Sequence, residues 1–273
     1  MRGSLPAAGK DFIRYGGHTS CLALAHDGAS PPTLFLDAGT GLLQAVSLLD
    51  GAPYAGALLL THLHWDHVVG LPFFSADARD GTRVDVLLPE QEDGADAASA
   101  LGGLMSPPYF PIGPLQMCGK WSFSTLPEGE LEVEGFSVLA REVPHKGGRT
   151  YGYRVSAGGA TIAYMPDHNP TALGPGEDGL GEYHPAALEL ARDADLLVHD
   201  AQLLPEELAA EAHFGHAAAD YAVALGERAG AGAVSLFHHR LDRTDDELDE
   251  LAARLGGRSS AVSVAAEGVV LHL

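Results

Sequence analysis

The segment Leu58–Phe74, LLLTHLHWDHVVGLPFF, places three imidazoles and one carboxylate within six positions, at His62, His64, Asp66 and His67. In an extended segment alternate side chains share one face, so His62, His64 and Asp66 can point the same way. Asp66 and His67 are adjacent, and a turn or helix start there would aim them at different points. One segment could therefore supply two ligands to one cation and two to another. Imidazole nitrogen and carboxylate oxygen suit Zn²⁺ or Mn²⁺, so the segment is predicted to bind metal.

The segment THLHWDH, at positions 61–67, resembles the main metal motif of the metallo-β-lactamase superfamily, and the resemblance covers nearly the whole chain. Three later segments, VPHKGG, AYMPDH and SLFHHR, each follow an expected strand and offer the remaining ligands. In the last of them only one of two adjacent histidines can follow the strand inward, and His238 is preferred over His239. The resemblance implies two divalent cations, zinc with manganese or iron as alternatives, held by these ligands: His62, His64 and His145 at the first subsite, Asp66, His67 and His238 at the second, and Asp167 bridging both.

Two further motifs indicate a branch of this superfamily. HDAQ at 199–202 and GHAA at 215–218 are similar to the His-Glu-Ala-Thr and Gly-His-Ser-Thr motifs of tRNase Z and related phosphodiesterases. The resemblance implies proton-transfer roles for Asp200 and His216. The chain departs from the pattern, because Asp in place of Glu shortens the reach and Ala-Ala replaces Ser-Thr. A structural role for His216 at a helix start is the alternative to a catalytic one.

The reaction implied for this branch is hydrolysis of a small or cyclic phosphodiester by a hydroxide that both cations share. We expect Asp66 to orient the attacking water or receive its proton. We expect His216 or His239 to protonate the leaving oxygen, because imidazoles titrate near neutral pH. Asp37, in LFLDAGTG, ends an earlier strand where the superfamily often has Asp-x-Gly, and it is expected to support the ligands rather than bind metal.

The charge of the chain limits its partners. Its 16 Lys and Arg residues face 37 Asp and Glu residues, for a formal net charge of −21, which repels a polyanion over most of the surface. The tRNase Z enzymes carry a long arm that grips tRNA, whereas His145 and Asp167 are only 22 positions apart here. We therefore expect a small-molecule phosphodiester as substrate and no nucleic acid. Members of this branch often form homodimers, so the resemblance leaves a homodimer open.

The sequence also bears on location. No apolar run approaches the roughly 18 residues that a membrane span needs, and the first 20 residues contain no signal-peptide hydrophobic stretch. The two cysteines, Cys21 and Cys118, are far apart and fit no metal-binding spacing. A cytoplasmic protein without membrane contact is the simplest expectation.

The elements that must position these residues are short apolar strands alternating with helical segments, a pattern typical of α/β folds. The resemblance implies one hydrolase domain over residues 1–273, a four-layer αβ/βα sandwich of two mixed sheets packed face to face with helices outside. Strands are predicted at 34–37, 57–61, 84–89, 136–143, 150–155, 161–165, 196–199, 234–237 and 269–273. Helices are predicted at 42–49, 95–104, 186–192, 205–213, 217–229 and 245–255, the last with a capping box at Thr244 and Glu247.

The segment 105–119, MSPPYFPIGPLQMCG, is the least regular part of the chain. Its four prolines forbid a regular helix. It is either a plain surface loop or a loop that overhangs a cleft, in which case Tyr109 and Phe110 would line the substrate site.

The fold alone does not decide the reaction. Hydrolysis of a carboxylic ester, a thioester or a lactone on the same metals is the first alternative to phosphodiester cleavage. The second is a non-catalytic member that binds a ligand without turnover, and the complete set of metal ligands argues against it.

Overall fold

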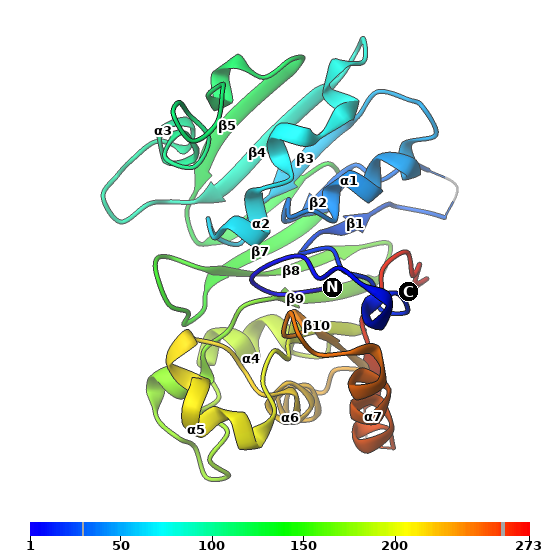
Figure 1. The fold of residues 1–273 in the computed structure, drawn as a ribbon, viewed down its shortest axis with the longest axis vertical. Helices are drawn as coiled ribbons and strands as arrows, with labels where there is room; N and C mark the ends of the chain where they lie inside the picture. The colour runs from blue at the N-terminus through cyan, green and yellow to red at the C-terminus, as the bar shows by residue number, and fades with distance from the viewer. Residues whose placement is uncertain (29, 258–259) are drawn as a thin grey trace.

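The computed structural model describes residues 1–28, 30–257 and 260–273, and its core is a pair of β-sheets (Figure 1). The smaller sheet runs β1-β2-β3-β4-β5, with β1 and β2 antiparallel and the other neighbours parallel. Its strands are β1 (Leu22–Leu24), β2 (Leu34–Leu36), β3 (Ala55–Leu59), β4 (Arg83–Pro89) and β5 (Lys120–Leu126).

The larger sheet runs β12-β11-β10-β9-β8-β7-β6. Neighbours from β6 to β9 are antiparallel, and those from β9 to β12 are parallel, so this sheet is mixed as well. Its strands are β6 (Gly129–Val133), β7 (Phe136–Glu142), β8 (Tyr151–Ala157), β9 (Ala160–Met165), β10 (Leu196–Asp200), β11 (Ala233–Phe237) and β12 (Ala261–Val264).

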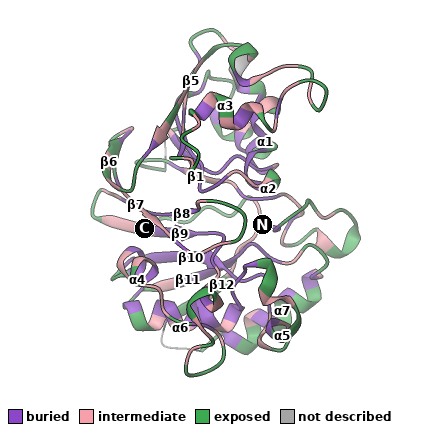
Figure 2. Cartoon of the chain, turned by 90° about the vertical axis from the view of Figure 1, so that its left-hand side faces the viewer, coloured by how far each residue is buried: buried purple, intermediate pink, exposed green. Residues whose placement is uncertain are grey.

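Helices cover the outer face of each sheet, and buried residues concentrate in the strands and on the inner sides of the helices (Figure 2). The smaller sheet carries α1 (Leu42–Ala45), α2 (Trp65–Val68) and α3 (Ala97–Gly102). The larger sheet carries α4 (Pro185–Ala191), α5 (Leu208–Glu211), α6 (Ala219–Ala229) and α7 (Asp245–Leu255). No helix among the described residues has the length and apolar character that crossing a bilayer requires.

The fold has four layers, which are the helices of the smaller sheet, the two sheets, and the helices of the larger sheet. Three apolar clusters fill the spaces between them. The central one lies between the sheets and joins residues such as Leu36 and Leu59 of the smaller sheet to Tyr153 and Val198 of the larger one. The other two clusters fill the space between each sheet and its own helices. The predicted αβ/βα sandwich with two mixed sheets is therefore confirmed.

Most predicted strands form where the alternation of side chains indicates them. In β7, for example, Phe136, Val138 and Ala140 are buried, as expected for one inward face of a strand. The neighbouring strands β8 and β9 form a hairpin that closes through Gly158 and Gly159, both at positive φ. The capping box of α7 is also present, since Thr244 and Glu247 hydrogen-bond each other's backbone amides.

The strand predicted at 269–273 is wrong. The apolar side chains of this segment are 55–67% exposed and no ladder forms there. The place beside β11 is taken by β12, whose Ala261–Val264 pair in parallel with it. Strands β1, β5, β6 and β12 were not predicted, and the helix expected at 205–213 is divided into α5 and two short 3-10 helices.

The fold brings several loops to one end of the two sheets. The chain leaves β3, β7, β9, β10 and β11 at their carboxyl ends, and each of the segments that follow carries a predicted site residue. In α/β sheets this end is where ligands bind, because the loops that follow the strands meet there.

Candidate metal centre

Two groups of side chains converge at this end of the sheets. Ligand atoms of His62, His64, His145 and Asp167 lie within 4.8 Å of one another, and so do those of Asp66, His67 and His238. The helix α2 begins directly after His64, which turns Asp66 and His67 away from the path of the preceding extended segment. One segment thereby contributes to both groups, as predicted. We call the group with His62 the first subsite and the group with His67 the second subsite.

Asp167 lies between the two subsites and presents one carboxylate oxygen to each. Its Oδ2 is 3.3 Å from His145 Nε2 and 3.7 Å from His62 Nε2. Its Oδ1 is 3.0 Å from His67 Nε2 and 3.2 Å from His238 Nε2. This is the arrangement expected of a carboxylate that bridges two cations.

The chemistry of these groups fits divalent cations. Within the described part of the chain, His62 Nε2 is a buried atom without a hydrogen-bond partner. Buried polar atoms are rarely left without a partner, so this unpaired nitrogen, 3.7 Å from Asp167 Oδ2, indicates a ligand at the first subsite. The donor set of imidazole nitrogens and carboxylate oxygens is the one that zinc, manganese and iron accept.

Burial and charge set the protonation of the ligands. Burial lowers the pKa of His145 to about 4 and that of His62 well below its ordinary value, so both rings are neutral near pH 7. Burial also disfavours the charge on His67, but the carboxylates of Asp167, Asp66 and Asp37 outweigh it and raise the pKa of His67 well above its usual range. The second subsite thus attracts positive charge, which a divalent cation can supply in place of the proton.

Asp37 lies behind the second subsite. Its carboxylate accepts hydrogen bonds from the Thr61 amide at 2.7 Å and from the Tyr164 hydroxyl at 2.9 Å, and it lies 2.8 Å from His67 Nδ1. A proton on Nδ1 directs Nε2 of the same ring toward the cluster. This is the supporting position expected for Asp37 from the sequence.

The first subsite has a similar support. His145 Nδ1 donates to the Gly215 carbonyl over 2.7 Å, which leaves Nε2 to face Asp167. Gly215 has φ +92°, and a Cβ on it would lie 2.9 Å from the Cβ of Lys146. Glycine at this position lets the loop that follows α5 approach the loop that carries His145.

Asp200 and His216 form a pair at the edge of the centre. His216 Nδ1 lies 2.9 Å from Asp200 Oδ2 and 3.9 Å from Asp167 Oδ2. Asp200 also accepts backbone hydrogen bonds from His168 at 3.0 Å and Ala217 at 3.2 Å, so it ties the loop of Asp167 to the loop of His216. Burial lowers the pKa of His216, but the charge and hydrogen bond of Asp200 outweigh it and raise that pKa to about 9.

The structure does not bring His239 to the cluster. Its Nε2 lies 3.3 Å from the Ala265 carbonyl, and its backbone pairs with Met1 and Gly3. His238, which precedes it, has φ 56° and turns its ring to the second subsite. The preference for His238 over His239 as the residue facing the cluster agrees with this geometry.

The aromatic residues of the segment 105–119 lie on the surface. Tyr109 is 83% exposed, and Phe110 packs edge-on against Phe73 with ring centroids 5.7 Å apart. Phe73 ends a short 3-10 helix, Leu71–Phe73, that follows α2. A place for Tyr109 and Phe110 beside a bound substrate stays a prediction.

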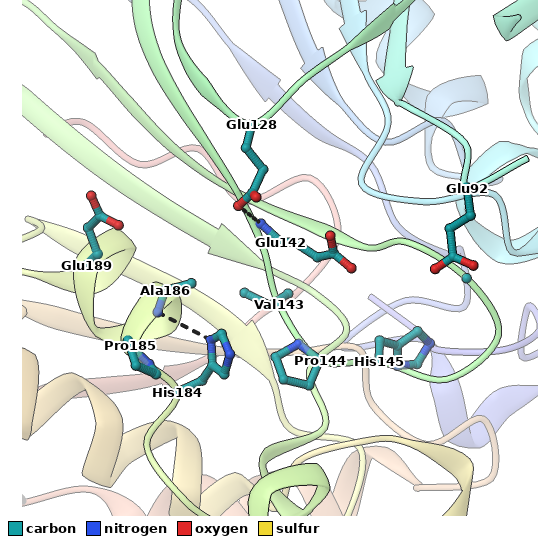
Figure 3. A pocket seen from close by; sticks show the side chains of 11 residues that line it. Glu92, Glu128, Glu142, Val143, Pro144, His145, His184, Pro185, Ala186 and Glu189 are labelled. Carbon is teal, nitrogen blue, oxygen red and sulfur yellow. Dashed lines mark hydrogen bonds between the residues drawn. The ribbon is translucent and has the colours of Figure 1, made fainter. Parts of the chain in front are cut away.

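A cavity of about 640 Å³ opens beside His145 (Figure 3). Four glutamates line it together with His145 and His184, and the Glu142 amide donates to the Glu128 carboxylate over 2.7 Å. The glutamates are Glu92, Glu128, Glu142 and Glu189. This group of glutamates could not be predicted from the sequence, because its members come from separate segments and match no motif.

Comparison with known proteins agrees with this architecture. A protein-family model, described as the beta-lactamase superfamily domain, matches residues 33–239 of this chain. A protein of Halobacterium salinarum named ribonuclease Z is 28% identical over 160 residues, which are 58% of this chain and 42% of that protein. The match therefore spans less than half the length of that relative.

Two solved structures show the same fold. The metallo-beta-lactamase fold protein YhfI from Bacillus subtilis superposes with a TM-score of 0.71 at 20% identity, over 99% of this chain and 95% of that one. A diphosphatase of the PhnP family superposes with a TM-score of 0.60 at 19% identity, over 88% of this chain and 79% of that one. The chain has two mixed sheets with a cluster of histidines and aspartates at one end, and the matched residues 33–239 include that whole cluster. The chain therefore belongs to the metallo-β-lactamase superfamily.

Proposed function

We propose that this metallo-hydrolase is a phosphodiesterase that uses two divalent cations to cleave a small or cyclic phosphodiester. The observation that carries the proposal is the Asp200–His216 pair beside the bridging carboxylate of Asp167. Cleavage of a P–O bond in a phosphodiester expels an alkoxide that needs a proton, and His216 holds one at neutral pH because its pKa is raised to about 9.

The residues that would hold the cations are those of the two subsites. His62, His64 and His145 would bind one cation, Asp66, His67 and His238 the other, and Asp167 both. When bound, two such cations supply Lewis acidity and lower the pKa of water enough to provide a nucleophile near neutral pH. The ligands favour zinc because most of them are imidazoles, and manganese or iron are alternatives that the two carboxylates also accept.

The chain's own groups then move the protons. Asp66 would orient the attacking water, a role supported by its Oδ2, which lies 3.0 Å from His238 Nε2 in the second subsite. His216 uses Nδ1 to contact Asp200, so the proton given to the leaving oxygen departs from Nε2. Asp200 keeps the imidazole oriented and compensates its positive charge until that transfer.

The size and charge of the surroundings support a small substrate. The interval between His145 and Asp167 is occupied by the β8–β9 hairpin, which belongs to the larger sheet. The formal net charge of −21 disfavours a polyanion, whereas a single phosphodiester can be attracted locally by bound cations. The similarity to a ribonuclease Z and to a diphosphatase fold supports chemistry at phosphorus rather than at a carbonyl carbon.

The test is hydrolysis of bis-p-nitrophenyl phosphate, with bound metal quantified in the same preparations of wild type and of Asp167→Ala. We expect the wild type to hydrolyse the substrate and to hold two cations per chain. We expect the variant to lose both the activity and the bound cations. Asp50→Asn, a surface substitution, serves as the matched control. Full metal content with no phosphodiesterase activity in zinc and in manganese, but with hydrolysis of a carboxylic ester, thioester or lactone, would replace the proposal by acyl hydrolysis.

A further inference from the structure

The Met1–Ser4 segment runs directly beside the second subsite. We propose that it is a positioning element of that subsite, which holds Asp66 and His238 in the geometry that a cation needs. The inference rests on the two-cation centre of the proposed function. It adds a part of the chain that contributes no metal ligand and lies more than 60 positions before Asp66 along the chain.

The first contact is made by the backbone of Ser4. Its amide donates to Asp66 Oδ2 over 2.7 Å, and the same oxygen lies 3.0 Å from His238 Nε2 and 3.4 Å from His67 Nε2. A carboxylate oxygen has two lone-pair directions, so the amide can occupy one and leave the other for a cation. Ser4 has φ 67°, a conformation that a residue other than glycine keeps only when its surroundings impose it.

The second contact is made by Gly3, which lies against the His238 ring. A Cβ on Gly3 would overlap the His238 imidazole and lie 2.6 Å from Gln202 Oε1. The Gly3 amide donates to the His239 carbonyl over 2.8 Å, and the His239 amide donates to the Met1 carbonyl over 3.0 Å. The segment thus holds the backbone directly after His238, whose own φ of 56° needs such support.

Arg2 anchors the segment between these two contacts. Its side chain is fully buried, and its guanidinium donates to the Gly16 carbonyl at 2.9 Å and to the Asp245 carboxylate at 3.4 Å. The Arg2 amide donates to the His18 carbonyl over 2.8 Å. A buried guanidinium with several acceptors fixes the segment in one position, as positioning of two ligands requires.

The support is selective for one subsite. Among the described residues, the hydrogen bonds of Met1–Ser4 reach Asp66 and the residue after His238, and none reaches the histidines of the first subsite. Disturbing the segment should therefore weaken the cation of the second subsite and leave that of the first subsite bound as before.

The test compares Gly3→Ala with wild type and with Gly102→Ala, whose added Cβ would meet open space in α3. Stepwise loading with ¹¹³Cd²⁺, followed by NMR and by competition with a chelator, reads each subsite separately. We expect two cadmium resonances in wild type and in the control. In Gly3→Ala we expect one unchanged cation and a second bound about 10–100-fold more weakly, the loss typical of a change behind a metal ligand. Unchanged affinities, or an equal loss at both subsites, would overturn the proposal.

A second variant covers the case in which Gly3→Ala does not fold, as judged by far-UV circular dichroism. Arg2→Lys loosens the anchor without placing an atom against His238, and the same selective loss is expected from it. Wild-type protein that takes up one cation only would defeat the two-cation centre itself, and the segment proposal with it. Two cations in wild type with unchanged binding in the variants would defeat the segment proposal alone.

Discussion

Asp200 makes the largest contribution to the raised pKa of His216, and the Asp167 and Asp66 carboxylates add to it. Because Asp200 raises the pKa of His216 to about 9, hydrolysis that uses this proton should fall as the pH rises through that value. In Asp200→Asn the largest contribution that raises this pKa is gone, so we expect the fall at lower pH. The measurement is kcat/KM against pH with saturating metal, from about pH 6 to about pH 10. A pH profile of Asp200→Asn that coincides with that of Asp50→Asn would contradict this role.

The same pair makes a contribution to stability whose sign can be worked out. The folded pKa of His216, about 9, lies above the ordinary value of 6.5, so the protonated ring stabilises the folded state. That contribution is fully present below about pH 6.5 and is lost as the pH rises through about 9. We expect the free energy of unfolding of the metal-free protein to fall over this window, and less so in His216→Gln, in urea titrations. An equal fall in both proteins would show that other groups dominate.

The carboxylate of Asp37 supports the candidate ligand His67 from behind, and a substitution at Asp37 tests this support. Replacing it by Asn removes the charge that faces His67 Nδ1, while a similar volume remains. We expect the second subsite to bind its cation about 10–100-fold more weakly, as calorimetric titration with zinc would measure. Binding at the first subsite provides the internal control, and a loss there of the same size would point to a general disturbance of the fold instead.

At the scale of elements, helix α7 depends on its capping box. Thr244→Ala removes the side chain that accepts from the Glu247 amide, so we expect the free energy of unfolding to drop by about 1 kcal/mol in urea titrations. Thr244→Ser keeps the hydroxyl and should therefore retain most of the stability that the cap contributes. Helix α7 packs on β12, the edge strand of the larger sheet, so the lost cap should be measurable as a change in global stability. An equal loss of stability in both variants would contradict the capping role.

The elements also show what a single sequence can predict. The candidate ligands could be predicted because His62, His64, Asp66 and His67 are close in sequence and follow a buried strand, a signal that is visible without a structure. The supports were harder to foresee. Ser4 acts through a backbone amide that every residue except proline has, and the glutamates of the cavity meet only after folding. The exposed run at Val269–Leu273 shows the converse, since apolar composition there does not produce a strand.

At the scale of the molecule, the centre joins both sheets. His62 follows β3 of the smaller sheet, while His145, Asp167 and His238 follow strands of the larger one. Cations that bind the native state alone stabilise it by about 3 kcal/mol each when present at about 100 times the Kd. We expect removal of metal with a chelator to lower the Tm by several degrees, and zinc to restore it, in calorimetric scans. Asp167→Ala should be insensitive to the chelator. An unchanged Tm in wild type would contradict a cation shared between the sheets.

The wide spacing of the ligands has a consequence for how the protein is made. His62 and His238 are separated by most of the chain, so during synthesis on the ribosome no complete site exists until the last ligand-bearing strand, β11, has emerged. The Met1–Ser4 segment leaves the ribosome long before its backbone partner His239, which lies more than 200 positions later in the sequence. The segment can therefore take its native place only after His239 has emerged, and the proposed second subsite is completed late in folding.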